Sequence, residues 1–295
     1  MTLTPRGIAV VLMVLVTVLW GSTFPLVKEL VAQVSPALML AARFTVAAMV
    51  LLPWLRQAGK ALWLEGALLG SVLFASYWTQ AIGMTTIPSG RAAFITGLNV
   101  ILVPLMLPFL KRRVPWPAFV AAALALGGIG LMSLNGASLE FGIGDLWVLG
   151  CATSYAVYIL LIDRAVTRHA TLPLAAVQVS VVCLLGWLTA VPEVFNGPGL
   201  KGLLQFWPQL LFLGVMATAL TTLMQAYAQR FLAAFQIATL SALEPVWAAI
   251  FGFFLLGERL SERGLIGAAL ILLAMVLSQA GAQADQLPAR ETQAQ

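Results

Sequence analysis

Ten apolar runs of about 20 residues, separated by short polar connectors, restrict this chain to one kind of fold. A helix needs roughly 20 apolar residues to cross a bilayer, because the hydrocarbon core is about 30 Å thick and each helical residue rises about 1.5 Å. The connectors, such as 56–60, 111–117 and 192–201, are too short to hold a soluble domain. The runs predict spanning helices over 8–31, 36–55, 62–83, 90–110, 116–134, 145–163, 172–191, 207–228, 234–256 and 263–281.

The balance of charged and apolar residues agrees with this interpretation. Only 9% of the residues are charged and 61% are hydrophobic, whereas a soluble domain carries about 25% charged residues. The excess of basic over acidic residues, 16 against 11, does not indicate nucleic-acid binding, because the basic residues stand one to three at a time between apolar runs. The first run is too long for a cleavable signal peptide. Cys151 and Cys183 lie inside apolar runs, where we interpret them as small hydrophobic side chains.

The distribution of Lys and Arg predicts that both termini are cytoplasmic. With the N-terminus inside, ten basic residues fall in cytoplasmic segments and five in outer segments, while Arg43 lies within a helix. The cytoplasmic set is Arg6, Arg56, Lys60, Lys111, Arg112, Arg113, Arg164, Arg168, Arg230 and Arg290, and the outer set is Lys28, Arg91, Lys201, Arg259 and Arg263. We expect the polar segment 282–295 to be a disordered cytoplasmic tail.

An internal repeat covers most of the chain. A shift of 145 residues aligns 80–134 with 225–279 without a gap, and three helices with two loops keep the same spacing. We therefore predict an all-α integral membrane protein with ten transmembrane helices, built from two five-helix repeats, 1–134 and 145–281. Because five is odd, the second repeat enters the membrane from the opposite side, and inverted repeats of this kind are typical of transporters.

The first, second and ninth helices carry short sequence motifs. The first helix carries Leu19-Trp20-Gly21-Ser22-Thr23-Phe24-Pro25, and the second carries Arg43 after Pro36. The ninth carries Leu243-Glu244-Pro245-Val246-Trp247, followed by Gly257-Glu258-Arg259. Together these segments resemble the ten-helix EamA-type branch of the drug/metabolite transporter superfamily, and the pattern is most similar to bacterial exporters of aromatic and other amino acids.

This resemblance implies a multi-pass permease of the bacterial inner membrane that exports amino acids or related metabolites without ATP hydrolysis. The residues themselves offer no P-loop and no His/Cys cluster, so we predict no enzymatic activity, no catalytic residue, no cofactor and no metal. The single histidine, His169, falls in a cytoplasmic loop, where we expect it to be solvated.

Two ionisable residues, Arg43 and Glu244, lie inside predicted spans, where charge is costly. Arg43 could grip a substrate carboxylate with its bidentate guanidinium, or it could be tied to backbone carbonyls at a helix break. Glu244 precedes Pro245, whose ring frees the carbonyl of Ser241. Its carboxyl group could couple transport to protons, bind a substrate ammonium or brace this kink. A direct ion pair between Arg43 and Glu244 is a further alternative.

Uncharged polar residues recur three positions apart on four helices, and residues with this spacing share a helix face. This pattern predicts a central cavity, although such residues could also join neighbouring helices by hydrogen bonds. The pairs are Tyr77 with Gln80, Thr96 with Asn99, Thr222 with Gln225, and Ser241 with Glu244.

Aromatic residues well inside the spans could contact an aromatic or amphipathic substrate, or they could simply pack. These are Trp20, Trp78, Tyr155, Tyr158 and Trp247.

The segment from Gly21 through Ser22 to Pro25 is expected to interrupt the first helix. We interpret Gly21 and Pro25, together with Pro245, as hinges, and we place Ser22 on the substrate pathway. Glu258 and Arg259, at the end of the ninth helix, are expected to be structural caps.

The leading hypothesis is a secondary transporter that exports small metabolites, most of all amino acids, by alternating access between the repeats. The alternative is a proton-coupled multidrug exporter of cationic amphipathic compounds. One buried arginine is too few for phosphorylated substrates or nucleotide sugars, while a membrane enzyme or a lipid-handling structural protein stays open. The expected partners are a small-molecule substrate and membrane lipid, and a monomer suffices because one chain holds both halves of a pathway.

Overall fold

A computed structural model describes residues 4–106, 108, 116–132, 134–135, 138–139, 141–196, 201–232 and 234–284. Helices form nearly all of this part of the chain, and its strands, β1 (Leu134–Asn135) and β2 (Ser138–Leu139), make one short antiparallel hairpin. The helices are α1 (Pro5–Val31), α2 (Pro36–Leu51) with η1 (Leu52–Gln57), α3 (Lys60–Gly83), α4 (Ser89–Thr96), α5 (Asn99–Leu105), α6 (Trp116–Met132), α7 (Ile143–Arg168), α8 (Thr171–Asn196), α9 (Lys201–Leu204), α10 (Trp207–Leu211), η3 (Phe212–Leu220), α11 (Thr221–Ala228), α12 (Ala234–Ser241), α13 (Glu244–Leu256) and α14 (Glu262–Ala284).

Every predicted spanning segment is mainly helical over the residues that the structure describes. Seven helical segments there are long and apolar enough to cross a membrane, and the segments Ser89–Leu105 and Trp116–Met132 are shorter apolar helices. Large apolar side chains such as Leu68, Leu126 and Leu184 face outward, as they must where the solvent is lipid. The chain is therefore a multi-pass membrane protein with the predicted ten-helix fold. Residues 111–113, used above for orientation, and residues 285–295 of the expected tail lie outside the described residues.

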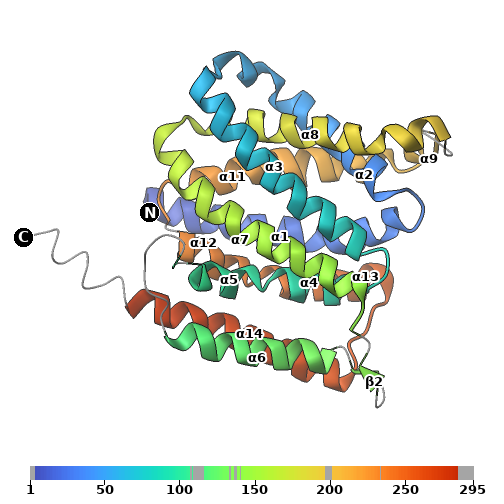
Figure 1. The fold of residues 1–295 in the computed structure, drawn as a ribbon, viewed down its shortest axis with the longest axis vertical. Helices are drawn as coiled ribbons and strands as arrows, with labels where there is room; N and C mark the ends of the chain where they lie inside the picture. The colour runs from blue at the N-terminus through green and yellow to red at the C-terminus, as the bar shows by residue number, and fades with distance from the viewer. Residues whose placement is uncertain are drawn as a thin grey trace, which may run out of the picture.

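The packing of the helices repeats with the symmetry that inverted repeats require. The second helix of each repeat packs on its counterpart (α2 on α8), and so does the fifth (α6 on α14). The first helix of one repeat contacts the broken fourth helix of the other, so that α1 lies on α12 and α13 while α7 lies on α4 and α5. Figure 1 shows α2 and α8 at one edge of the bundle, α6 and α14 at the opposite edge, and the start of α1 at the same end as the end of α14.

Both repeats break their fourth helix at the same place. The first break separates α4 from α5 at Gly97 and Leu98, and the second separates α12 from α13 at Ala242 and Leu243. These positions differ by 145 residues, the shift of the internal repeat. A Cβ atom at Gly97 would lie 2.9 Å from the ring of Pro245, so the two breaks face each other at the centre of the bundle.

The expected interruption of the first helix is wrong. Helix α1 runs unbroken through Gly21 and Pro25. Gly21 is needed for helix packing instead. A Cβ atom at Gly21 would lie 3.0 Å from the amide nitrogen of Ala248 and 3.1 Å from the carbonyl oxygen of Glu244. Glycine at this position lets α1 and α13 approach with their backbones nearly in contact.

Candidate functional site

A small cavity lies beside the second helix break, between the two repeats. Its volume is about 30 Å³, roughly the share of one water molecule in the liquid. Six of the predicted pathway residues line it: Trp20, Tyr77, Gln80, Thr96, Tyr155 and Glu244. These six come from α1, α3, α4, α7 and α13, so both repeats contribute to one site, as the polar spacing predicts.

Glu244 is the only acidic residue on the lining of this cavity. It is the first residue of α13, and its side chain is buried. Within the part of the chain that the structure describes, its carboxyl group makes no hydrogen bond and no ion pair. The partial positive charge at the start of a helix favours an acid at this position, but a buried carboxylate without a partner still needs a proton or a cation.

Arg43 is also buried, but it does not line the cavity. Its Nε donates to Thr218 Oγ1 at 2.7 Å and its Nη2 to the carbonyl oxygen of Ala217 at 3.2 Å. Both acceptors belong to η3, a π-helical stretch in which the backbone carbonyls lose their usual partners. The guanidinium also lies 4.7 Å from the centre of the Tyr77 ring. Of the alternatives left open above, the structure therefore shows an arginine tied to carbonyls, with no ion pair to Glu244.

The remaining polar residues of the predicted stripe are buried beside the cavity and turn toward backbone. Asn99 Nδ2 donates to the carbonyl oxygen of Thr96 at 2.8 Å, and Ser241 Oγ donates to that of Ile237 at 3.0 Å. The helix break explains the first contact, because Val100 N donates to Gly97 instead and leaves the Thr96 carbonyl free. Gln225 is buried but is absent from the lining.

The predicted aromatic residues divide into two groups. Trp20 and Tyr155 meet edge to face at the cavity, with ring centres 5.7 Å apart, and Trp20 Nε1 donates to Ala217 O at 3.2 Å. The others stand outside the lining. Trp78 stacks on Phe74, and Tyr158 donates its hydroxyl to Gln178 Oε1 at 2.8 Å, so both have packing roles. Trp247 lies against Gly21 of α1.

Three residues that line the cavity were not predicted from the sequence: Thr23, Ser76 and Cys151. Thr23 follows Trp20 by three positions and Ser76 precedes Gln80 by four, so the same-face spacing could have identified both. Thr23 lines the cavity and the predicted Ser22 does not, although both hydroxyls donate to the backbone carbonyl three residues earlier at 2.7 Å. No such pattern marks Cys151, whose sulfur lies 3.3 Å from Ser76 Oγ.

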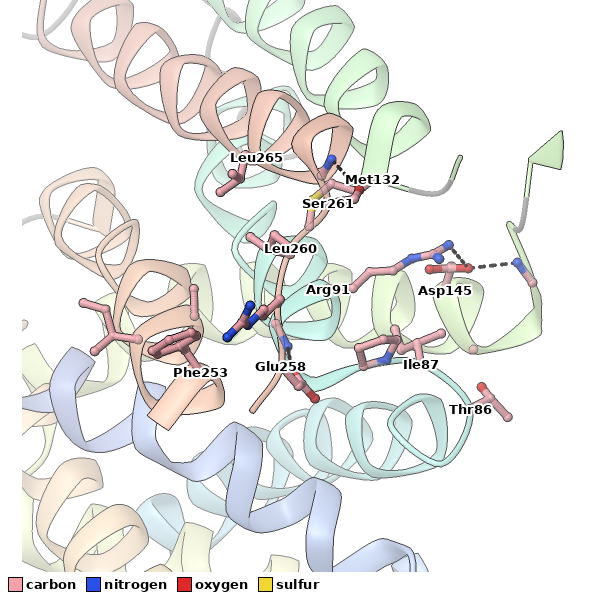
Figure 2. A pocket seen from close by; sticks show the side chains of 18 of the residues that line it. Thr86, Ile87, Arg91, Met132, Asp145, Phe253, Glu258, Leu260, Ser261 and Leu265 are labelled. Atoms are coloured by element: carbon pink, nitrogen blue, oxygen red, sulfur yellow. Dashed lines mark hydrogen bonds and ion pairs between the residues drawn. The ribbon is translucent and has the colours of Figure 1, made fainter. Parts of the chain in front are cut away.

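A second and larger pocket of about 1270 Å³ lies at the end of the bundle opposite the termini, where α13 turns into α14 (Figure 2). Beside it, Glu258 accepts hydrogen bonds from Ser89 N at 3.0 Å, Ser89 Oγ at 2.7 Å and Gly90 N at 3.1 Å. Glu258 is thus a structural cap, as expected, but the helix that it caps is α4 of the other repeat. Arg91 forms an ion pair with Asp145 at 2.7 Å.

Two smaller expectations need correction. Arg259 caps no helix through any contact that the structure describes, and its guanidinium lies 5.9 Å from the centre of the Phe253 ring. His169 is not simply solvated. Its side chain is only 14% exposed, and its Nε2 lies 3.3 Å from Glu65 Oε2, because the α7–α8 connector folds back onto the start of α3.

Comparison with known proteins identifies the fold family. The chain matches the EamA-like transporter family over residues 7–134 and 142–279. It is 29% identical over 263 residues to an uncharacterized transporter of Archaeoglobus fulgidus, covering 89% of this chain and 83% of that one. It is 27% identical to the uncharacterized transporter YwfM of Bacillus subtilis, covering 72% of each chain, and 25% identical to a chloroplastic WAT1-related protein of Arabidopsis thaliana, covering 88% of this chain and 66% of that one.

A solved crystal structure superposes with a TM-score of 0.67 at 19% identity and covers 95% of this chain and 98% of its own. At that identity the likeness concerns the fold alone. The two matched segments coincide with the two inverted repeats seen in the structure. The chain therefore belongs to the EamA-like transporter family of the drug/metabolite transporter superfamily and is a membrane transporter.

Proposed function

We propose that this chain is a secondary transporter that exports small amine-bearing metabolites, with amino acids as the first class to test. The observation that carries this proposal is the buried carboxyl group of Glu244, which has no partner among the described residues and stands on a cavity shared by both repeats. A substrate ammonium or a proton would satisfy this group. Exchange between the two is the basis of proton-coupled export.

The cavity chemistry supports an amine with an adjacent polar group. Trp20, Tyr77 and Tyr155 bring aromatic rings to the site, and the face of such a ring attracts a cation. A substrate carboxylate would meet only neutral donors there, from residues such as Ser76, Gln80 and Thr96, because no basic side chain lines the cavity.

The size of the cavity implies that transport requires movement of the repeats. A space of about 30 Å³ is far below the roughly 300 Å³ of the smallest ordinary ligand pockets. The described conformation is therefore closed around the site, and a substrate binds after the broken helices separate. This fits alternating access, in which the helices would bend or separate at the paired breaks near Gly97 and Ala242.

The second candidate is a proton-coupled exporter of cationic amphipathic compounds. One observation favours it: Arg43, one of the two buried ionisable candidates and the possible partner for a substrate carboxylate, donates to Thr218 and Ala217 instead. The cavity thus combines an acid and aromatic rings without a basic side chain.

Matched pairs of substrates separate the two candidates. Purified protein in liposomes is offered tyrosine or tyramine, and tryptophan or tryptamine, with and without a pH gradient. Uptake of the amino acids supports the first candidate, and uptake of the decarboxylated amines alone supports the second. Failure to move any of the four compounds or a cationic dye, with folded protein and an intact gradient, contradicts both.

We further propose the bacterial inner membrane as the location, with both termini cytoplasmic, and a monomer as the working unit. The basic residues of the connectors support this orientation. The two repeats within one chain support the monomer, since together they enclose the whole cavity.

A further inference from the structure

The 1270 Å³ pocket at the α13–α14 turn is far larger than the central cavity and is separate from it. Its walls are the outer face of α13, the loop from Gly257 to Ser261 and the start of α14, and the starts of α4 and α7 close its base (Figure 2). The central cavity has a different set of lining residues.

The pocket exists because the α6–α14 pair diverges from the rest of the bundle. These two helices pack tightly on each other, and they contact α5 and α12, the halves of the broken helices nearer the termini. In the described part of the chain they make at most sparse contact with α4 and α13, the other two halves. Figure 1 shows the pair as a separate layer along one edge of the molecule. The space left at this end lies between α13 and the start of α14.

The wall of the pocket presents apolar side chains to the bilayer. Ile250, Phe253, Phe254 and Leu265 line it and are all more than a third exposed. Their exposure on a soluble protein would mark a binding surface, and on a spanning helix it marks a surface for acyl chains.

Among the described residues that line the pocket, Arg259 is a cation for which no contact with a carboxylate is described. Arg91 is paired with Asp145 at 2.7 Å, and the Glu258 carboxylate is occupied by its three hydrogen bonds to the start of α4. Arg259 is exposed, and no contact with a carboxylate is described for it; its guanidinium lies at the edge of the apolar wall, 5.9 Å from the Phe253 ring centre. A guanidinium at the mouth of an apolar groove is complementary to a phosphate attached to an acyl chain.

We propose that this pocket binds one phospholipid from the leaflet on its own side of the membrane. Arg259 binds the phosphate, and the groove between α13 and α14 holds an acyl chain against Phe253, Phe254 and Leu265. The volume is ample, since it exceeds the roughly 300–1,000 Å³ of pockets that enclose drug-sized ligands. The bound lipid fills the gap beside the α6–α14 pair and links its two helices to α13. This site is independent of the substrate proposed for the central cavity.

Native mass spectrometry of the delipidated full chain tests the proposal. Phosphatidylglycerol and a diacylglycerol with the same acyl chains are titrated separately, so that the two lipids differ by the anionic phosphoglycerol headgroup. We expect one phosphatidylglycerol to bind with roughly tenfold higher affinity than the diacylglycerol, the equivalent of one charge-assisted contact. Arg259→Ala should remove this difference, whereas Arg263→Ala, a matched change outside the lining, should keep it.

A separate variant tests the part of the site that holds the acyl chain. Leu265→Trp places a larger side chain at an exposed position of the groove and should lower the affinity for both lipids. All variants are compared at equal monodispersity and unfolding temperature. Any one of four results would overturn the proposal. These are equal affinity for the two lipids, equal effects of the changes at Arg259 and Arg263, unaltered lipid affinity in Leu265→Trp, and displacement of the lipid by a transported amine. Loss of transport with retained lipid binding would count against the proposed function alone.

Discussion

The contact between Glu258 and the start of α4 joins the two repeats at one end of the bundle, and we predict that neutralising Glu258 opens that end. Helices α4 and α13 run from the central breaks to this end, and the carboxylate of Glu258 joins them across the two repeats. The position 145 residues earlier holds Arg113, so the sequence repeat does not place an equivalent acid in the first repeat. We predict that Glu258→Gln shifts the equilibrium toward a state open at the Glu258 end.

The structure sets the size of the shift. Three hydrogen bonds end on the carboxylate, at 3.0, 2.7 and 3.1 Å, and hydrogen bonds to a charged group contribute about 1.5–3 kcal/mol each. Glutamine can keep two of them as weaker neutral contacts, because its oxygen can accept from Ser89 Oγ and Gly90 N, but its amide nitrogen cannot accept from Ser89 N. We expect a loss of about 2–4 kcal/mol from the closed state, or on the order of a hundredfold change in the equilibrium.

Cys151 reports this opening, because it is buried and lines the central cavity. In a Cys183→Ser background, the rate of Cys151 modification by an impermeant thiol reagent is measured in proteoliposomes that hold the protein in both orientations. Glu258→Gln should raise this rate by up to two orders of magnitude, and Ser89→Ala, which removes one of the three contacts, should raise it less. Glu262→Gln is the matched control. Equal rates in the variants at Glu258 and Glu262, with unchanged unfolding temperature, would refute the reasoning.

Three further predictions follow from packing and charge. Gly21→Ala should lower the free energy of unfolding by about 1–3 kcal/mol, because the added methyl group clashes with α13. Gly127→Ala, where a Cβ atom meets nothing within 4 Å, should leave the free energy of unfolding unchanged. Thermal unfolding in detergent measures both variants. Arg43→Lys should lower the unfolding temperature, because lysine cannot make both guanidinium hydrogen bonds to η3, and it should leave the KM ratio between amino acids and amines unchanged. A selective loss of transport of carboxylate-bearing substrates would show that Arg43 binds the substrate. Reporter fusions should place both termini in the cytoplasm, and a periplasmic C-terminus would contradict the orientation.

The overall fold was largely predictable from the sequence, because lipid imposes a simple length and composition rule on every span. Of the two helix breaks, the sequence predicted only the one beside Pro245; the other, just before Asn99, lies 145 residues earlier, at the shift of the internal repeat. The continuity of α1 was not predictable from its Gly21–Pro25 segment. Glycine and proline mark either a break or a close helix contact, and only the position of α13 distinguishes them.

The candidate site was predictable in part. Spacing on a helix face correctly gathered Tyr77, Gln80, Thr96 and Glu244, because neighbouring turns of one face point the same way. It could not show that Asn99 would turn back to a freed carbonyl, or that Arg43 would be held by a π-helical stretch in the eighth span. Both depend on local backbone hydrogen bonding that no residue pattern specifies.

Transport by Glu244→Gln in liposomes tests the central claim most directly, because glutamine keeps the shape of the side chain but cannot take up or release a proton. Wild type, Glu244→Gln and the exposed control Glu262→Gln are compared at equal amounts of folded protein, in gradient-driven uptake and in downhill exchange of the best substrate from the matched-pair screen. We predict that gradient-driven uptake by Glu244→Gln falls to the level of protein-free liposomes while Glu262→Gln matches wild type. Gradient-driven uptake by Glu244→Gln at the wild-type rate would contradict the role assigned to this carboxyl group.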